Sequence, residues 1–158
     1  MKRFFLSILL AAAGFCLSAQ SAQKITELIA TEKANYGNAS WLIAVQTGLA
    51  QDTNTDEETF EILVENDYIS QKPSATGERL IPSAEDEIKI KDFASLCLRA
   101  YKIKGGLMYR ITKSPRYALR ELKAMKVVSN DADPNTIVSG KQMIHILNTC
   151  GYTMEASK

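Results

Sequence analysis

Side chains suited to catalysis are scarce in this sequence. His145 is the only histidine, and it stands between Ile144 and Ile146 in a stretch with helical apolar spacing, so we expect a partly buried structural residue. Cys97 and Cys150 also stand at apolar helical positions. No Cys-x-x-Cys, His-Glu-x-x-His, phosphate-binding loop or Gly-x-Ser-x-Gly motif occurs. The sequence therefore predicts a protein that is not an enzyme and that holds no cofactor.

Two acidic loops have part of the spacing of a calcium-binding loop. In the first, Asp52, Asn54 and Asp56 alternate as oxygen ligands do. Glu57 replaces the glycine of the sixth position, and Leu63 replaces the glutamate of the twelfth. The second loop offers Asp131, Asp133, Asn135 and Gln142. We interpret both as solvated loops or helix caps and assign no metal site, while a small calcium-dependent binder or enzyme stays open as a disfavoured alternative.

One segment interleaves aromatic and arginine side chains, which are enriched at interaction hot spots. It spans the start of a predicted helix, so arginines extending over a core tyrosine are the competing interpretation. The only tryptophan is a further candidate. The candidate binding residues are Trp41, Tyr109, Arg110, Arg116, Tyr117 and Arg120.

The chain that positions these residues is predicted to be all-α. Thr55 is expected to cap one helix, whose first turn is acidic, and Ser114 another, with Pro115 in its first turn. Short extended pieces are expected only near Leu80-Ile81 and Met108–Ile111. Apolar spacing predicts helices in the segments 24–34, 39–50, 53–69, 91–103, 115–128 and 139–152.

The first residues have the layout of a cleavable secretory signal peptide. Lys2 and Arg3 precede an uncharged apolar stretch, which is shorter than the roughly 20 residues of a membrane span. Small residues follow, so we expect a signal peptide over 1–19, cleaved after Ala19 or as late as residue 22. The protein is therefore expected in the periplasm or outside the cell, with no stable membrane span after cleavage.

A lipoprotein tether through Cys16 is a second possibility for the N-terminus. Bulky Phe15 stands where lipidated chains have a small residue, so this tether is disfavoured. Removal of Lys2 and Arg3 changes the formal net charge from +1 to −1. This balance argues against a nucleic-acid partner and predicts no polybasic membrane patch. The length after cleavage suits a single helical domain over 24–152.

Export would place Cys97 and Cys150 in an oxidising compartment, where paired cysteines can form a disulfide. Their apolar surroundings favour two buried free thiols, with the disulfide as the alternative. A bridge between them would stabilise the fold by roughly 4 kcal/mol in the chain-entropy model. The sequence leaves both states open.

An internal repeat relates two helix–loop–helix units, about 55–103 and about 114–152. Their first helices align at a constant offset, and their second helices align at another. Repeats of this size indicate units that must stack to bury their apolar faces. The aligned pairs are Phe60 with Leu119, Leu63 with Leu122, Ile69 with Val128, Ser70 with Ser129, Ile88 with Val138, Lys91 with Lys141, Phe93 with Met143 and Leu96 with Ile146.

These units resemble the bacterial S-layer homology (SLH) domain in their apolar spacing, over roughly 55–150. Segment 39–50 resembles a degenerate half-unit before them. The resemblance implies a helical fold that holds exported proteins to cell-wall polysaccharide. It implies an Ile-Thr-Arg-Ala-Glu-like motif at the second helices, where only Asp92 keeps the acidic residue, and Ile90 and Gly140 replace the arginine that would grip a carboxylate.

Taken together, these observations predict a non-catalytic exported protein that binds a cell-envelope component or has a structural role there. The open alternative is a periplasmic adaptor that binds another envelope protein through the surface from Tyr109 to Arg120.

Overall fold

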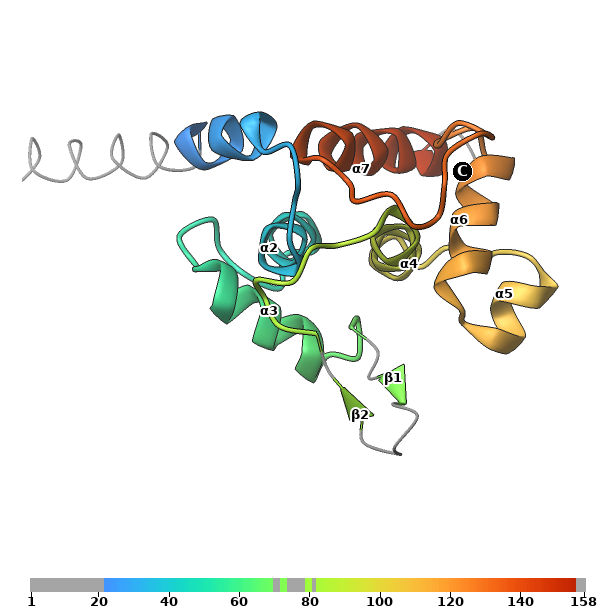
Figure 1. Ribbon diagram of the computed structural model, residues 1–158, viewed down its shortest axis with the longest axis horizontal. Helices are drawn as coiled ribbons and strands as arrows, with labels where there is room; N and C mark the ends of the chain where they lie inside the picture. The colour runs from blue at the N-terminus through green and yellow to red at the C-terminus, as the bar shows by residue number, and fades with distance from the viewer. Residues whose placement is uncertain (1–21, 70–71, 74–78, 81, 156–158) are drawn as a thin grey trace, which may run out of the picture.

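The computed structural model describes residues 22–69, 72–73, 79–80 and 82–155, so the predicted signal peptide lies outside the described residues. The predicted all-α class is confirmed (Figure 1). Two two-residue strands, β1 and β2, form a small antiparallel pair. The elements are helix 22–30, α2 (Tyr36–Thr47), α3 (Asp56–Glu65), β1 (Lys72–Pro73), β2 (Arg79–Leu80), α4 (Ile90–Ala100), α5 (Leu107–Thr112), α6 (Pro115–Ala124) and α7 (Gly140–Glu155).

Local capping fixes the starts of α2 and α3. Thr55 Oγ1 accepts a hydrogen bond from the Glu58 backbone N–H at 3.2 Å, and the Glu58 carboxylate accepts one from the Thr55 N–H at 3.0 Å. Asn35 and Asn38 form the equivalent reciprocal box before α2. Such boxes satisfy backbone donors that have no partner within the helix. The predicted Thr55 cap is therefore confirmed.

Two local predictions between α4 and α6 were wrong. Met108–Ile111 is helical rather than extended, because Gly106 starts α5 and Lys113 ends it in the left-handed region at φ 51°. Ser114 does precede α6, but its side chain makes no capping hydrogen bond. The Tyr117 N–H, which a capping side chain could have accepted from, donates to the Ser114 carbonyl oxygen at 3.0 Å instead.

Three extended segments meet in a closed ring of backbone hydrogen bonds. Ala34 N–H donates to the Val138 carbonyl at 2.9 Å, Val138 N–H to Ile88 at 3.1 Å, and Ile88 N–H to Ala34 at 3.0 Å. Each of these residues stands two positions before a helix, namely α2, α4 or α7. The N-terminal segment thus takes a third position beside the two units recognised in the sequence.

A second set of hydrogen bonds joins the same three segments in the opposite direction around the ring. Tyr36 N–H donates to Asp86, Ile90 N–H to Thr136, and Gly140 N–H to Thr31, at 3.0, 2.9 and 2.9 Å. Each donor is the first residue of α2, α4 or α7. The starts of these three helices are therefore held together by main-chain bonds as well as by side chains.

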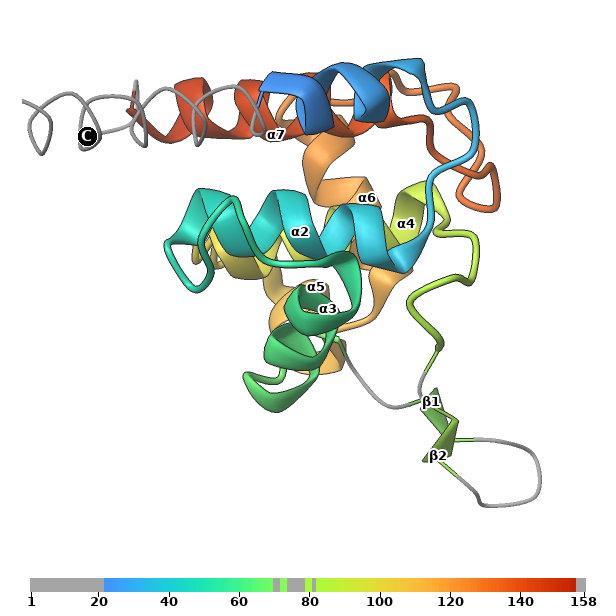
Figure 2. The same cartoon turned by 90° about the vertical axis from the view of Figure 1, so that its left-hand side faces the viewer.

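The second helices of the three units form the centre. α2, α4 and α7 contact one another, α3 packs on α2, and α6 packs on α4. Helix 22–30 lies beside α7 (Figure 2). It approaches so closely that a Cβ on Gly140 would lie 1.7 Å from the Leu28 carbonyl oxygen. Glycine is thus required at the start of α7.

Three of the aligned pairs of residues are fully buried in both units. Ile88 and Val138 are both fully buried, as are Leu63 and Leu122, and Phe93 and Met143. All core residues among those described lie between Leu28 and Cys150. Among the described residues, the core thus extends from helix 22–30 to α7.

Candidate functional site: a cationic end formed by α4, α5 and α6

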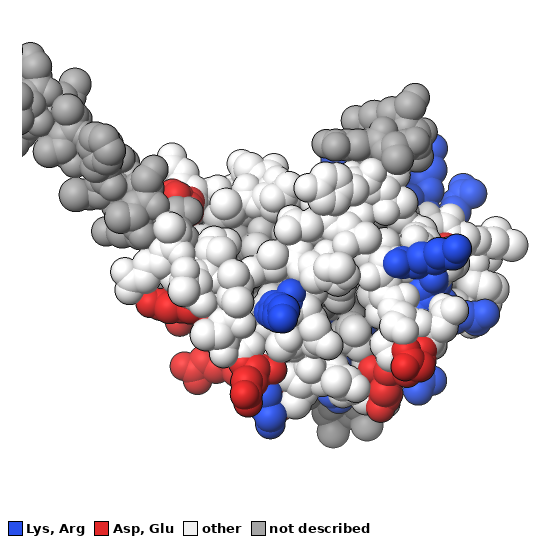
Figure 3. All heavy atoms as spheres, turned by 90° about the horizontal axis from the view of Figure 1, so that it is seen from above, with Lys and Arg blue, Asp and Glu red and all other residues white. Residues whose placement is uncertain are grey.

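Charge is strongly segregated along the chain. Residues 99–126 contain nine Lys or Arg residues and one acidic residue, Glu121, which gives a formal charge of +8. Residues 22–67 contain nine acidic residues and two lysines, which gives −7. Seen from above, Lys and Arg gather at the end that carries α5 and α6, and the opposite end is mainly acidic (Figure 3). The small net charge conceals a large charge asymmetry.

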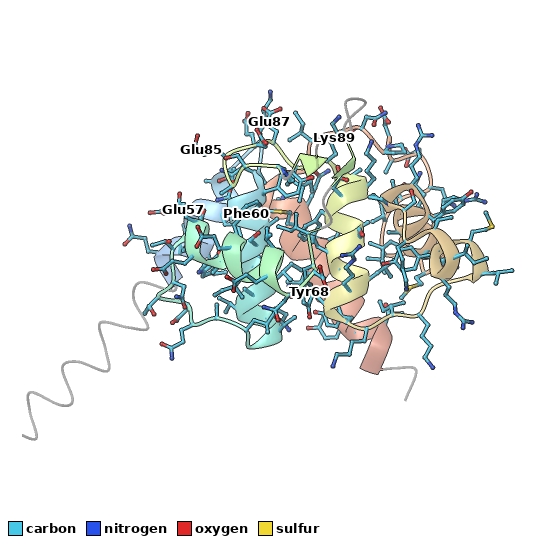
Figure 4. The ribbon with its side chains drawn as sticks, turned by 90° about the horizontal axis from the view of Figure 1, so that it is seen from below. Glu57, Phe60, Tyr68, Glu85, Glu87 and Lys89 are labelled. Atoms are coloured by element: carbon cyan, nitrogen blue, oxygen red, sulfur yellow. The ribbon has the colours of Figure 1, made fainter. Side chains whose placement is uncertain are left out.

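A groove of about 510 Å³ opens at this cationic end, between the end of α3, the C-terminal end of α4, and α5. Lys102, Lys104 and Lys113 line it, together with Arg99. The Arg99 guanidinium donates to the carbonyl oxygens of Asp67 and Tyr68, so Arg99 holds the α3 end against α4. Figure 4 shows Tyr68 between these two helices.

The three predicted arginines lie on this same end of the molecule. Arg110 on α5 and Arg116 and Arg120 on α6 are exposed, and Tyr117 is half-buried. The Arg120 guanidinium lies 5.7 Å from the centre of the Tyr117 ring, which is cation–π geometry. We call the part of the molecule that carries these three arginines and the groove lysines the cationic end.

Two predicted binding residues do not contribute a free surface. Trp41 is only 2% exposed, because α2 is central and covered on all sides, and its indole N–H donates to the Asp52 carbonyl at 3.3 Å. Tyr109 is also 2% exposed and packs against the turn at Gly105. Lys113 lies 5.3 Å over the Tyr109 ring. Both aromatic residues support the fold instead.

The positions where the SLH resemblance implies an arginine cannot hold one here. Ile90 is 6% exposed and belongs to the core. Gly140 has no room for any side chain because Leu28 backbone atoms abut it. Asp92 is buried at 7% exposure, and its charge, together with burial, raises the pKa of Tyr36. An anionic ligand would therefore not find the family's arginine at the ring.

The potential nucleophiles are buried. Cys97 on α4 and Cys150 on α7 are both fully buried free cysteines. Burial raises the pKa of the Cys97 thiol well above its ordinary value, whereas interaction with the Cys97 thiol lowers the pKa of Cys150. His145 is exposed, so the expectation of a partly buried histidine was wrong. Residues adjacent in a helix point about 100° apart, which turns His145 outward beside buried Ile146.

Side chains of the two acidic loops are engaged in local structure. Asp56 pairs with Lys24 at 2.8 Å and accepts from the Asn38 amide at 2.9 Å. Asn135 accepts from Lys91 at 2.7 Å. Hydrogen bonds from the Ser129 side chain and from its own backbone lower the pKa of Asp131. Within the described ranges, no three His, Cys, Asp or Glu side chains gather as a metal site.

Sequence reasoning missed the groove lysines, Lys102, Lys104 and Lys113. The signal was present as charge density, because the segment 99–126 is almost free of acidic residues. Averaging over the whole chain removed that signal, and the prediction that the chain carries no polybasic patch was therefore wrong. Local charge, counted segment by segment, would have predicted the cationic end.

Comparison with protein-family models and with curated proteins finds no match. Among the described helices, none combines the length and the apolar character needed to cross a bilayer.

Proposed function

We propose that this chain is an exported, non-catalytic protein that attaches to the cell envelope by binding an anionic envelope component at its cationic end. The observation that carries the proposal is the +8 formal charge of residues 99–126, displayed around an open groove. Clustered cations attract anionic partners over about a Debye length and raise their rate of association. The layout of the first residues favours export, which would bring this end to the envelope.

The SLH-like arrangement supports the same compartment but a different binding position. Stacked helical units suit a structural or binding role, although a fold does not determine function. Because Ile90 and Gly140 exclude the arginine implied at the ring, the ligand is assigned to Lys102, Lys104 and Lys113 instead. In this proposal the SLH-like helices are the scaffold, and the groove lysines are the binding site.

Envelope co-sedimentation tests the proposal. Purified residues 22–158 are mixed with washed envelope, and the bound fraction is measured from low to high salt. We expect binding that weakens with salt and that falls strongly in the variant Lys102→Gln/Lys104→Gln/Lys113→Gln. Lys141→Gln, an exposed lysine on α7, is the matched control and should bind normally. Equal binding by all three proteins, independent of salt, would contradict the proposal.

A protein partner is the second candidate, because exposed Arg116 and the Arg120–Tyr117 pair form an arginine–aromatic surface. Cross-linking in intact cells, followed by mass spectrometry, distinguishes it. One protein recovered with wild type and lost with Arg116→Ala/Arg120→Ala would favour this adaptor role.

A further inference from the structure

The helix at the tip of the cationic end carries apolar side chains in solvent. On α5, Leu107 and Ile111 are each 69% exposed, and Met108 is 48% exposed. Single exposed apolar residues are ordinary, but three on one six-residue helix form a patch, and patches mark interaction sites. The fold holds this patch in place, because Tyr109 of the same helix is buried against the body.

Cations surround this apolar tip. Arg110 lies on α5 itself, Lys104 and Lys113 flank its two ends, and Arg116 follows at the start of α6; all four are exposed. Figure 1 shows α5 as a short helix next to α6, at the end of the molecule away from helix 22–30. A tip with an apolar centre and a basic border matches an anionic bilayer, which offers an apolar layer beneath negatively charged headgroups.

We infer that α5 is a membrane-contact element. Leu107, Met108 and Ile111 enter the interfacial region of a bilayer, while the surrounding lysines and arginines bind anionic lipid headgroups. This inference rests on the proposed envelope attachment and names its partner as an anionic lipid surface. Long basic side chains suit this role, because their methylene groups extend through the apolar boundary while the charges stay at the headgroups.

The charge distribution sets the orientation and argues against pairing of two copies through this tip. Two such tips would bring their +8 segments together. The −7 segment 22–67 is instead repelled by an anionic surface, which directs α5 toward it. The competing occupant of the tip is a second copy of the chain, which would place its acidic end against the basic end of the first. The experiments below include a measurement of self-association that detects such a contact.

Vesicle co-sedimentation tests the inference. Residues 22–158 are mixed with phosphatidylglycerol–phosphatidylcholine vesicles and with phosphatidylcholine vesicles. We expect binding to the anionic vesicles alone, weakened by salt.

Two variants separate the apolar and the basic contributions to vesicle binding. Leu107→Ser/Ile111→Ser should weaken this binding at least about tenfold because two apolar side chains no longer enter the bilayer. Arg110→Gln/Arg116→Gln should weaken it about 25-fold, since each basic residue near an anionic surface contributes about fivefold. Ile29→Ser, which alters an apolar residue 49% exposed on helix 22–30, is the matched control.

A second readout reports insertion directly. Ile111→Cys carries an environment-sensitive dye, and labelling is selective because Cys97 and Cys150 are buried. A blue shift on anionic vesicles supports insertion. No vesicle binding, or binding unchanged by Leu107→Ser/Ile111→Ser, would overturn the membrane inference. Salt-sensitive envelope binding without vesicle binding would leave the proposed function standing with a polymeric ligand. Self-association in analytical ultracentrifugation, abolished by the same double variant, would assign the tip to a second copy and also overturn the inference.

Discussion

Gly140 offers a direct perturbation of the three-segment ring. A methyl group added there would lie 1.7 Å from the Leu28 oxygen and 2.7 Å from the Leu28 carbonyl carbon. No rotation of an alanine side chain relieves this contact, because the clashing atoms are backbone. Gly140→Ala must therefore move helix 22–30 away from α7.

The cost of that movement can be worked from the bonds that it stretches. Gly140 N–H to Thr31 and Ala34 N–H to Val138, both at 2.9 Å, join the N-terminal segment to the start of α7. Weakening two such bonds costs about 1–3 kcal/mol, and overpacking costs about 1–3 kcal/mol more. Alanine recovers about 1 kcal/mol of helix propensity. We expect a net loss of about 3 kcal/mol in the free energy of unfolding.

Urea unfolding followed by tryptophan fluorescence measures this loss. The only tryptophan, Trp41, is 2% exposed in α2, so its emission reports on the centre of the fold. Gly151→Ala is the matched control in the same helix: its Cβ would lie 3.2 Å from the Tyr101 hydroxyl, which is a side-chain atom rather than backbone. That variant should stay within about 1 kcal/mol of wild type. If Gly140→Ala were as stable as Gly151→Ala, helix 22–30 would not pack on α7 as described.

Three further predictions concern the core and the caps. In an oxidising compartment we expect a Cys97–Cys150 disulfide, because both residues are fully buried on α4 and α7, two helices that contact each other. Denatured protein should then show no free thiol, and reduction should lower the free energy of unfolding by roughly 4 kcal/mol. Two free thiols by mass spectrometry would refute the bridge. Burial and nearby carboxylates raise the folded-state pKa of Tyr36, so the protonated phenol should contribute its full stability below about pH 10, and this contribution should be lost as the pH rises further. Tyr36→Phe should therefore flatten the fall of the urea midpoint at alkaline pH. An unchanged slope would exclude Tyr36 as the cause of that fall. Thr55→Ala should lower the free energy of unfolding, measured by calorimetry, by about 1 kcal/mol because the N-cap of α3 is lost. Thr53→Ala, at an exposed position nearby, is the control, and an equal loss in that variant would refute the capping argument.

Local signals carried most of the correct predictions. Thr55 followed by an acidic turn predicted the start of α3, because capping depends on residues three positions apart. The offset pairing of Ile88 with Val138 predicted equivalent positions, and both residues lie in the ring. The third member, Ala34, was missed because a small alanine stands where the other units have Ile88 and Val138, so only 39–50 was interpreted as a degenerate half-unit.

Long-range contacts account for what the sequence did not predict. The requirement for glycine at position 140 arises from Leu28, which is far away in the chain. Trp41 is buried because it lies on α2, a central helix of the fold. The residue type alone does not predict this burial. Met108–Ile111 is too short for apolar spacing to separate strand from helix. Its helical state follows from the turns at Gly106 and Lys113.

The central claim is that the protein is exported and held electrostatically on the envelope. The most direct measurement expresses the full chain with its own N-terminus, fractionates the cells, washes the envelope with rising salt, and determines the N-terminus by mass spectrometry. The account predicts a chain that begins after Ala19, or as late as after residue 22, and that stays with the envelope until salt releases it. An intact Met1 in the cytoplasmic fraction, or envelope attachment that resists salt, would contradict it.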